Sequence, residues 1–235
     1  LLEMCELKRL RDETEPDKIL KKIEQFHKIF NVSEDCEDDE LKRAAHTSCA
    51  LDALVDENRL GAMAYYYEGS SGNDYENIVT SLIAGNTLLT ADNVPVSGEC
   101  EIKNAVAMKI MDLFGCGGSF SEFYAYDFVD DIVMWGHDGP AHAAIAEGAV
   151  GLVPLPVYHG KPGKGLSIQM SVKTGPVTLL SVVQGAQGKT FLLCAEGESV
   201  PGPVLNIGNT NSRYKFSLSA GEFTEAWSKP GPSHH

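Results

Sequence analysis

The sequence predicts an α/β segment followed by an all-β segment, and two patterns carry this prediction. Up to residue 115, helical periodicity alternates with short apolar runs, which is typical of a parallel sheet covered by helices. After Gly115–Gly118, short apolar runs follow one another with Gly and Pro turns between them, which is typical of an antiparallel sandwich or barrel. We therefore expect a Rossmann-like parallel α/β layer in residues 1–115 and an antiparallel β-barrel in residues 116–235.

Two helices are predicted near the start of the chain. Ile19, Ile23, Phe26 and Phe30 recur at spacings of three and four, which is the apolar stripe of an amphipathic helix. The acids of Asp38–Glu40 favour the positively polarised start of a second helix. The apolar face of that second helix consists of Leu41, Ala45, Cys49 or Ala50, and Leu54.

The rest of the first segment alternates between extended and helical patterns. Residues 62–67 form an apolar and aromatic run that predicts a buried strand, and a glycine-rich loop follows it. Helices are expected over residues 75–84 and 101–114, with a short element at residues 87–90. Because ligands collect at the carboxyl ends of parallel strands, Glu68 in the loop is either a substrate contact or a water-facing carboxylate. The loop matches no phosphate-binding fingerprint.

The second segment reads as a series of strands. Strands are expected over residues 166–172, 177–183, 190–195 and 214–218, and the stretches Lys173–Pro176 and Gly185–Gly188 separate the first three as turns. One helical turn is expected within His142–Glu147. Regular spacing of short strands is what predicts the barrel.

Composition limits the classes of function. The formal net charge of -14 and the pI near 4.8 argue against nucleic-acid partners and anionic membranes, which both call for basic surfaces. No apolar run reaches the ~18 residues of a spanning helix, and the first residues do not resemble a signal peptide. The six cysteines form no Cys-x-x-Cys pair, which indicates reduced thiols in a cytoplasmic protein. The first residue is not methionine, so we expect a piece of a longer protein.

Carboxylates and imidazoles occur near turns in four separated segments. Glu99 precedes a predicted helix, Glu122 lies in an aromatic-rich stretch, His137 lies in a turn bounded by glycine and proline, and His234 and His235 come last. Carboxylate and imidazole donors together suit a divalent cation. Glu122 is difficult to explain structurally, because an unpaired carboxylate among apolar side chains costs free energy.

Glu99, His137 and the final histidine pair each have a simpler interpretation. Glu99 is otherwise an acid in the first turn of a helix, with Glu101 as the ligand, and His137 is otherwise a capping residue. The final pair is otherwise the remainder of a purification tag, although the preceding tryptophan, glycine and proline favour natural sequence. Between His234 and His235 the sequence does not decide, and we take His235 as the ligand.

Five segments of this chain share a pattern with a known family. They are, in order, Ser97–Ala105, Ser119–Phe128, Gly136–His137, Thr174–Pro176, and Ala226–Trp227 with Gly231–His235. These segments resemble the L-arabinose isomerases and their L-fucose isomerase-like relatives. The matching family segments are Gly-Glu-(x)-Asp/Glu-x-Lys-x-Ala, Ser-Phe-x-Glu-x-Tyr-x-Tyr-x-Phe, a Gly-x-His or Gly-His pair, a Thr-Gly-Pro turn, and a terminal Trp, Gly and His-His.

The resemblance implies an aldose–ketose isomerase that uses Mn²⁺ or another divalent cation. It implies that Glu99, Glu122, His137 and His235 bind the metal, and that Glu99 and Glu122 also act as the acid–base pair. Isomerisation moves a carbonyl from C1 to C2 of a free sugar through a cis-enediol, which requires a base and an acid on neighbouring carbons. An alternative is a sugar-binding or assembly module derived from such an isomerase, and a third is an unrelated metal-binding β domain.

The chain departs from the family in two respects. Residues 138–141 read Asp-Gly-Pro-Ala, where arabinose isomerases have Met-Leu-Glu-Val, so we expect a different sugar. Family members carry a further α/β domain ahead of this region, and their sugar pocket is shared between subunits. Glu68, Asn73 and Asp74 are the obvious sugar-binding candidates in the α/β part. Because these few residues cannot hold every sugar hydroxyl, we expect a homo-oligomer and little turnover by this chain alone.

Overall fold

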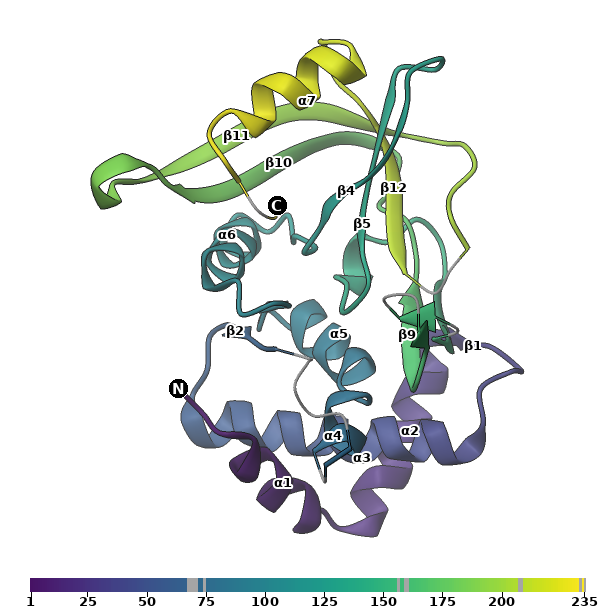
Figure 1. Cartoon of the computed structure of the whole chain (residues 1–235). Coiled ribbons are helices and arrows are strands. Elements are labelled where there is room, and N and C mark those ends of the chain that lie inside the picture. Colours follow the sequence, from purple (N-terminus) through teal and green to yellow (C-terminus); the bar gives the residue numbers. More distant parts are fainter. Residues whose placement is uncertain are drawn as a thin grey trace.

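The computed structural model describes residues 1–66, 72–73, 75–155, 157–158, 161–206, 209–232 and 234. Its content is mixed α/β, with both parallel and antiparallel sheets. Figure 1 shows helices α1 to α5 gathered in the lower half, a long curved sheet in the upper half, and α6 between them. The described helices are α1 (Met4–Asp12), α2 (Pro16–Ile29), α3 (Asp38–Asn58), α4 (Glu76–Val79), α5 (Ile83–Ala91), α6 (Ile102–Leu113) and α7 (Ala220–Ser228).

The strands divide into four sheets. In chain order they are β1 (Phe30–Val32), β2 (Met63–Ala64), β3 (Val96–Ser97), β4 (Glu122–Asp127), β5 (Ile132–His137), β6 (Val150–Pro154), β7 (Val157–Tyr158), β8 (Lys161–Pro162), β9 (Leu166–Gln169), β10 (Gly175–Gln184), β11 (Thr190–Val200) and β12 (Thr210–Lys215). The largest sheet is antiparallel, with the order β10-β11-β12-β5-β4, and a smaller one has the order β1-β6-β9. Pairs β2-β3 and β7-β8 make up the others.

Several predicted helices are confirmed. Helix α2 buries Ile19 and Phe26, helix α3 begins at Asp38 as predicted, and α6 lies within the expected range 101–114. The predicted helix over residues 75–84 is instead divided into α4 and α5, and α5 also contains the short element expected at residues 87–90. A single 3₁₀ turn is present at Ala143–Ile145, inside the predicted stretch.

The predicted barrel does not close in the described part of the chain. Strands β10 and β4 are the two edges of the five-stranded sheet and do not pair with each other. Helix α6 packs on β10 instead, where Ala107 contacts Leu180 and Val182. A closed barrel requires its first and last strands to pair with each other, so the sheet is open. Parallel pairing among the described strands is limited to β1 with β6 and β2 with β3.

One core cluster joins residues from both sides of the predicted boundary at residue 115. Phe26 and Phe30 from the N-terminal part pack in it with Leu152 and Ile168 from the C-terminal part. The parallel pairing of Phe30 with Val150 adds backbone hydrogen bonds to this contact. A second cluster packs α1 and α3 around Leu51, and a third packs α7 on the five-stranded sheet around Trp135. None of the described helices has the length and apolarity needed to span a membrane.

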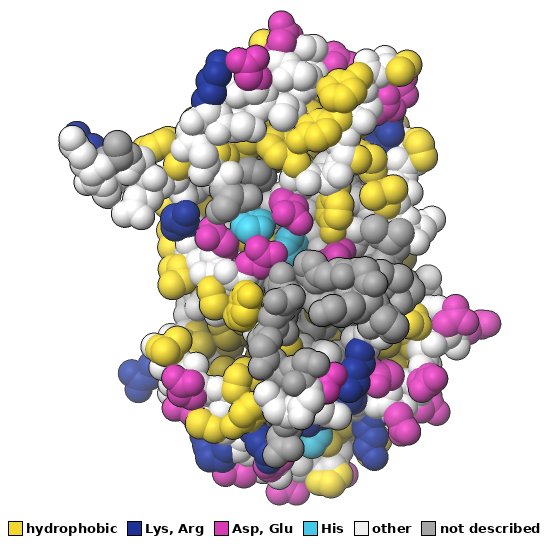
Figure 2. Space-filling view, in the orientation of Figure 1, with side chains coloured by type: hydrophobic (Ala, Val, Ile, Leu, Met, Phe, Trp, Pro, Cys, Tyr) yellow, Lys and Arg dark blue, Asp and Glu magenta, His cyan; other side chains and the backbone are white. Residues whose placement is uncertain are grey.

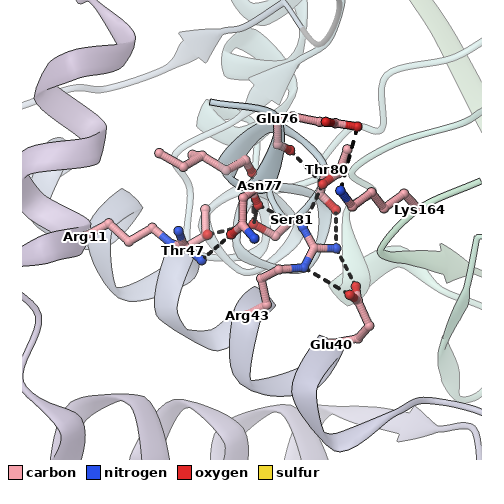
Figure 3. A network of polar contacts seen from close by, with 10 residues as sticks. Arg11, Glu40, Arg43, Thr47, Glu76, Asn77, Thr80, Ser81 and Lys164 are labelled. Carbon is pink, nitrogen blue, oxygen red and sulfur yellow. Dashed lines mark hydrogen bonds and ion pairs between the residues drawn. The ribbon is translucent and has the colours of Figure 1, made fainter. Parts of the chain in front are cut away.

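A polar network centred on Arg43 joins α3 to α4 (Figure 3). The Arg43 guanidinium donates to the Asn77 carbonyl at 2.8 Å and to the Thr80 hydroxyl at 2.6 Å. It also forms an ion pair with Glu40, and its side chain is only 9% exposed. At Gly165, which has a φ of +90°, a Cβ would lie 1.9 Å from the Thr80 carbonyl oxygen. Glycine at this position therefore lets the 164–165 turn approach the network.

We expect Arg43→Met to lower the free energy of unfolding by about 2–4 kcal/mol, because it leaves the partly buried Glu40 carboxylate without its cation and removes the hydrogen bonds of the guanidinium to Asn77 and Thr80. Arg9→Met is the matched control, since Arg9 pairs with Glu13 and Glu57 at the surface with a side chain that is 48% exposed. Such pairs contribute about 0–1 kcal/mol. Urea unfolding followed by circular dichroism measures both, and equal losses would contradict the role given to Arg43.

Candidate metal centre

Glu99 lies in the turn that connects β3 to α6, and its backbone is in an uncommon conformation. Glu99 and Cys100 both have φ of +56°, a left-handed region that costs free energy for residues other than glycine. Two hydrogen bonds hold the turn, from the Cys100 amide to the Tyr65 carbonyl and from the Glu101 amide to the Gly98 carbonyl, both at 2.9 Å. This conformation fixes the direction in which the Glu99 side chain leaves the backbone.

Glu122 and His137 come from neighbouring antiparallel strands. Glu122 begins β4 and is paired in register with Gly136, so His137 follows directly at the end of β5. All six residues of β5 are buried. On the other side of β5, the Thr210 hydroxyl accepts from the His137 amide at 3.3 Å and donates to the His137 carbonyl at 3.2 Å. A Cβ at Gly136 would lie 1.9 Å from the Thr210 carbonyl oxygen, so glycine permits this close strand pairing.

His234 is brought to the same place after the chain leaves α7. Its carbonyl oxygen accepts a hydrogen bond from the Ser181 hydroxyl of β10 at 2.8 Å. Its ring stacks on Phe120, with ring centroids 4.6 Å apart. The same Phe120 ring contacts His137 edge-on at 4.2 Å. Phe120, which is fully buried, therefore positions both imidazoles.

The carboxylate of Glu99 lies between the two imidazoles. Its Oε2 is 3.2 Å from Nε2 of His234, and its Oε1 is 3.6 Å from Nε2 of His137. Glu122 Oε2 is 3.8 Å from the same His234 nitrogen. The donor atoms of Glu99, His137 and His234 all lie within 4.8 Å of one another.

The donor set and its spacing fit one divalent cation. Adjacent ligands at ~2.1 Å from a common ion are about 3.0–3.4 Å apart, close to the distances found here. One carboxylate and two imidazoles form the close group, and the Glu122 carboxylate lies beside it. Such donors suit Mn²⁺, Zn²⁺ or a similar ion and do not specify which metal is bound. The two histidine side chains are buried and the two glutamate side chains are about one-third and two-fifths exposed. The centre is thus closed on the histidine side and open on the carboxylate side.

Burial favours the neutral form of His234. Burial lowers the pKa of His234, and the nearby His137 lowers it further, while the Glu99 carboxylate acts in the opposite direction. A neutral imidazole is the form that binds a metal. Figure 2 shows histidine side chains at the middle of the molecular face with acidic side chains around them. Such a concentration of negative charge attracts cations.

Of the residues predicted from sequence, the structure brings Glu99, Glu122 and His137 together. His234 joins them, while His235, which the sequence analysis took as the ligand, lies outside the described residues. Glu101, the alternative to Glu99, is not part of the group, and its carboxylate lies 3.9 Å from Lys103 Nζ. Binding of a metal by these residues stays a prediction.

Other sequence-based candidates do not join the centre. Glu68 and Asp74 lie outside the described residues, and the Asn73 side chain accepts from the Tyr75 amide at 2.9 Å. Phe120 is part of the site but was not predicted from the sequence. No charge or spacing signals that role, which depends on packing between rings far apart in the sequence.

No protein-family model matches the chain, and a search of curated proteins also gives no match.

We expect His234→Ala to weaken Mn²⁺ binding by about 10-fold to 1000-fold, because it removes one of the three donors that lie within 4.8 Å of one another. Isothermal titration calorimetry with Mn²⁺ measures the affinity. His27→Ala, on the exposed side of α2, is the control for the loss of a histidine elsewhere. The variant His235→Ala distinguishes the two terminal histidines, and a large loss there with none in His234→Ala would assign the ligand to His235.

Proposed function

We propose that this chain carries the metal centre of a metal-dependent aldose–ketose isomerase that acts on a free sugar. The observation that carries the proposal is the convergence of Glu99, Glu122, His137 and His234. These residues occupy the motifs that resemble the L-arabinose and L-fucose isomerase-like family. The site and the motifs together support the proposal.

The position of Glu99 also supports the proposal. Glu99 follows the carboxyl end of β3, which pairs in parallel with β2, and ligands in α/β proteins bind at such strand ends. This is the position expected if the short β2-β3 pair belongs to a Rossmann-like layer. We also propose that residues 1–115 correspond to the central α/β domain of such an isomerase and residues 116–235 to its C-terminal β domain.

A divalent cation such as Mn²⁺, held by these four side chains, would supply Lewis-acid stabilisation of negative charge on the sugar oxygens. The chain's own residues would move the protons. Glu122, the more exposed carboxylate, takes the proton from C2 of the aldose while the C1 oxygen gains one, which gives a cis-enediol. A proton is then returned to C1 and the C2 hydroxyl loses its proton, which completes the ketose. Glu99 is the partner acid in this scheme.

The buried histidines complement the exposed carboxylates. Phe120 covers one side of both imidazoles, so water has limited access from that side. The substrate must therefore approach from the carboxylate side, where the proton transfers occur. We propose that the remaining sugar hydroxyls are partly held by a second subunit of a homo-oligomer.

We expect Glu122→Gln to abolish isomerisation in the full-length natural protein while Mn²⁺ binding is largely retained. The amide can coordinate through its oxygen but cannot accept a proton, and loss of a general base costs ~10²–10⁴ in rate. The assay measures ketose formation from L-arabinose, L-fucose and D-galactose with Mn²⁺, and EDTA should abolish the activity.

Glu147→Gln is the control, since Glu147 lies outside the centre and its carboxylate accepts from the Thr174 amide at 2.8 Å. Retained activity in metal-loaded Glu122→Gln would assign the base elsewhere, with Glu99 as the next candidate. Tight Mn²⁺ and sugar binding without turnover in the natural full-length protein would instead support a sugar-binding module.

A further inference from the structure

Tyr124 and Asp138 form a polar pair beside the metal centre. The Tyr124 hydroxyl donates to Oδ1 of Asp138 at 2.7 Å. Tyr124 lies two residues after Glu122, and Asp138 directly follows His137. Each member of the pair is therefore tied by the backbone to a different residue of the centre.

A strand irregularity turns Tyr124 out of the regular ladder. The register between β4 and β5 shifts between Phe123 and Ala125, so Tyr124 is the extra residue of a β-bulge. Bulges change the direction of a side chain and are common beside active sites. In this position the phenol donates the 2.7 Å hydrogen bond to Asp138 Oδ1 and so holds the carboxylate in place.

The Asp138 carboxylate has unused hydrogen-bonding capacity. Two carboxylate oxygens offer about four acceptor positions, and the phenol uses one. Among the described residues, no Lys, Arg or His forms an ion pair with Asp138, and its Oδ2 has no hydrogen-bond partner. A half-buried carboxylate without a cation costs free energy, which a bound donor would reduce.

Asp138 lies next to the metal-ligand group but does not belong to it. The donor group within 4.8 Å contains Glu99, His137 and His234. The adjacent turn packs closely, since a Cβ at Gly139 would be 3.3 Å from His137 Nδ1. A carboxylate that is near a cation site but outside it suits a neutral molecule whose hydroxyls donate hydrogen bonds.

We propose that Asp138, positioned by Tyr124, accepts a hydrogen bond from a hydroxyl of a polyol substrate and so selects its stereochemistry. This inference rests on the proposed isomerase function, because it places a polyhydroxylated ligand at the metal. The subsite distinguishes epimers, since only one configuration at a given carbon directs its hydroxyl toward Oδ2. A ligand without that hydroxyl leaves the carboxylate unpaired.

Binding of L-arabitol and ribitol to the Mn²⁺-loaded full-length protein, measured by calorimetry, tests the inference without requiring turnover. We expect the wild-type protein to prefer one of these epimers. Asp138→Ala should weaken binding of the preferred polyol by about 10-fold to 100-fold, the range for a lost hydrogen bond to a charged group. Tyr124→Phe should weaken it by about 3-fold to 10-fold. In both variants the preference between epimers should fall and the Mn²⁺ affinity should be unchanged.

Two matched controls separate this role from general disturbance. Tyr126→Phe removes a phenol from the same strand, where Tyr126 stacks on Phe128, and Asp92→Ala removes an exposed carboxylate after α5. Neither should change polyol binding. If Asp138→Ala keeps the wild-type affinity and epimer preference, or if the wild-type protein binds neither polyol, the inference is wrong. Polyol selection by Asp138 without any isomerisation would sustain this subsite and reject the proposed reaction.

Discussion

The contact of the Phe120 ring with two imidazoles is the interaction on which the candidate site depends. Phe120 touches His137 from β5 and His234 from beyond α7, and a Cβ on Gly98 would lie 3.3 Å from the same ring. One buried aromatic side chain therefore determines how three separate segments approach one another. The imidazole nitrogens lie within 3.2–3.8 Å of the Glu99 and Glu122 carboxylate oxygens.

Local patterns predicted the helices more successfully than the sheets. Helices α2 and α3 could be recognised because their apolar spacing and acidic starts are encoded within a few residues. The pairing of β1 with β6 could not, because register between strands so far apart is decided by packing rather than by either sequence. The same reason applies to the expected barrel, since no local signal shows whether β10 and β4 pair or remain the edges of an open sheet.

The candidate site was predictable as a set of residues but not as an arrangement. Glu99, Glu122 and His137 stand out because charged groups beside turns and aromatic residues need an explanation. The choice between His234 and His235 depends on where the chain turns after α7, which sequence does not determine. In the sequence, Asp138 differs from the family pattern but shows no other sign of a role. Its hydrogen bond to Tyr124 depends on a β-bulge, which the alternation of apolar and polar residues along a strand does not predict.

The pairing of Phe30 with Val150 has a consequence for synthesis of the chain. During translation, β1 leaves the ribosome long before its partner β6 exists, and the apolar face of α2 and β1 must wait for Leu152 and Ile168 to cover it. Contacts between residues so distant in sequence carry a large loop-closure entropy and form late. Nascent chains therefore expose this surface for seconds, which makes them a natural substrate for chaperones that bind apolar segments.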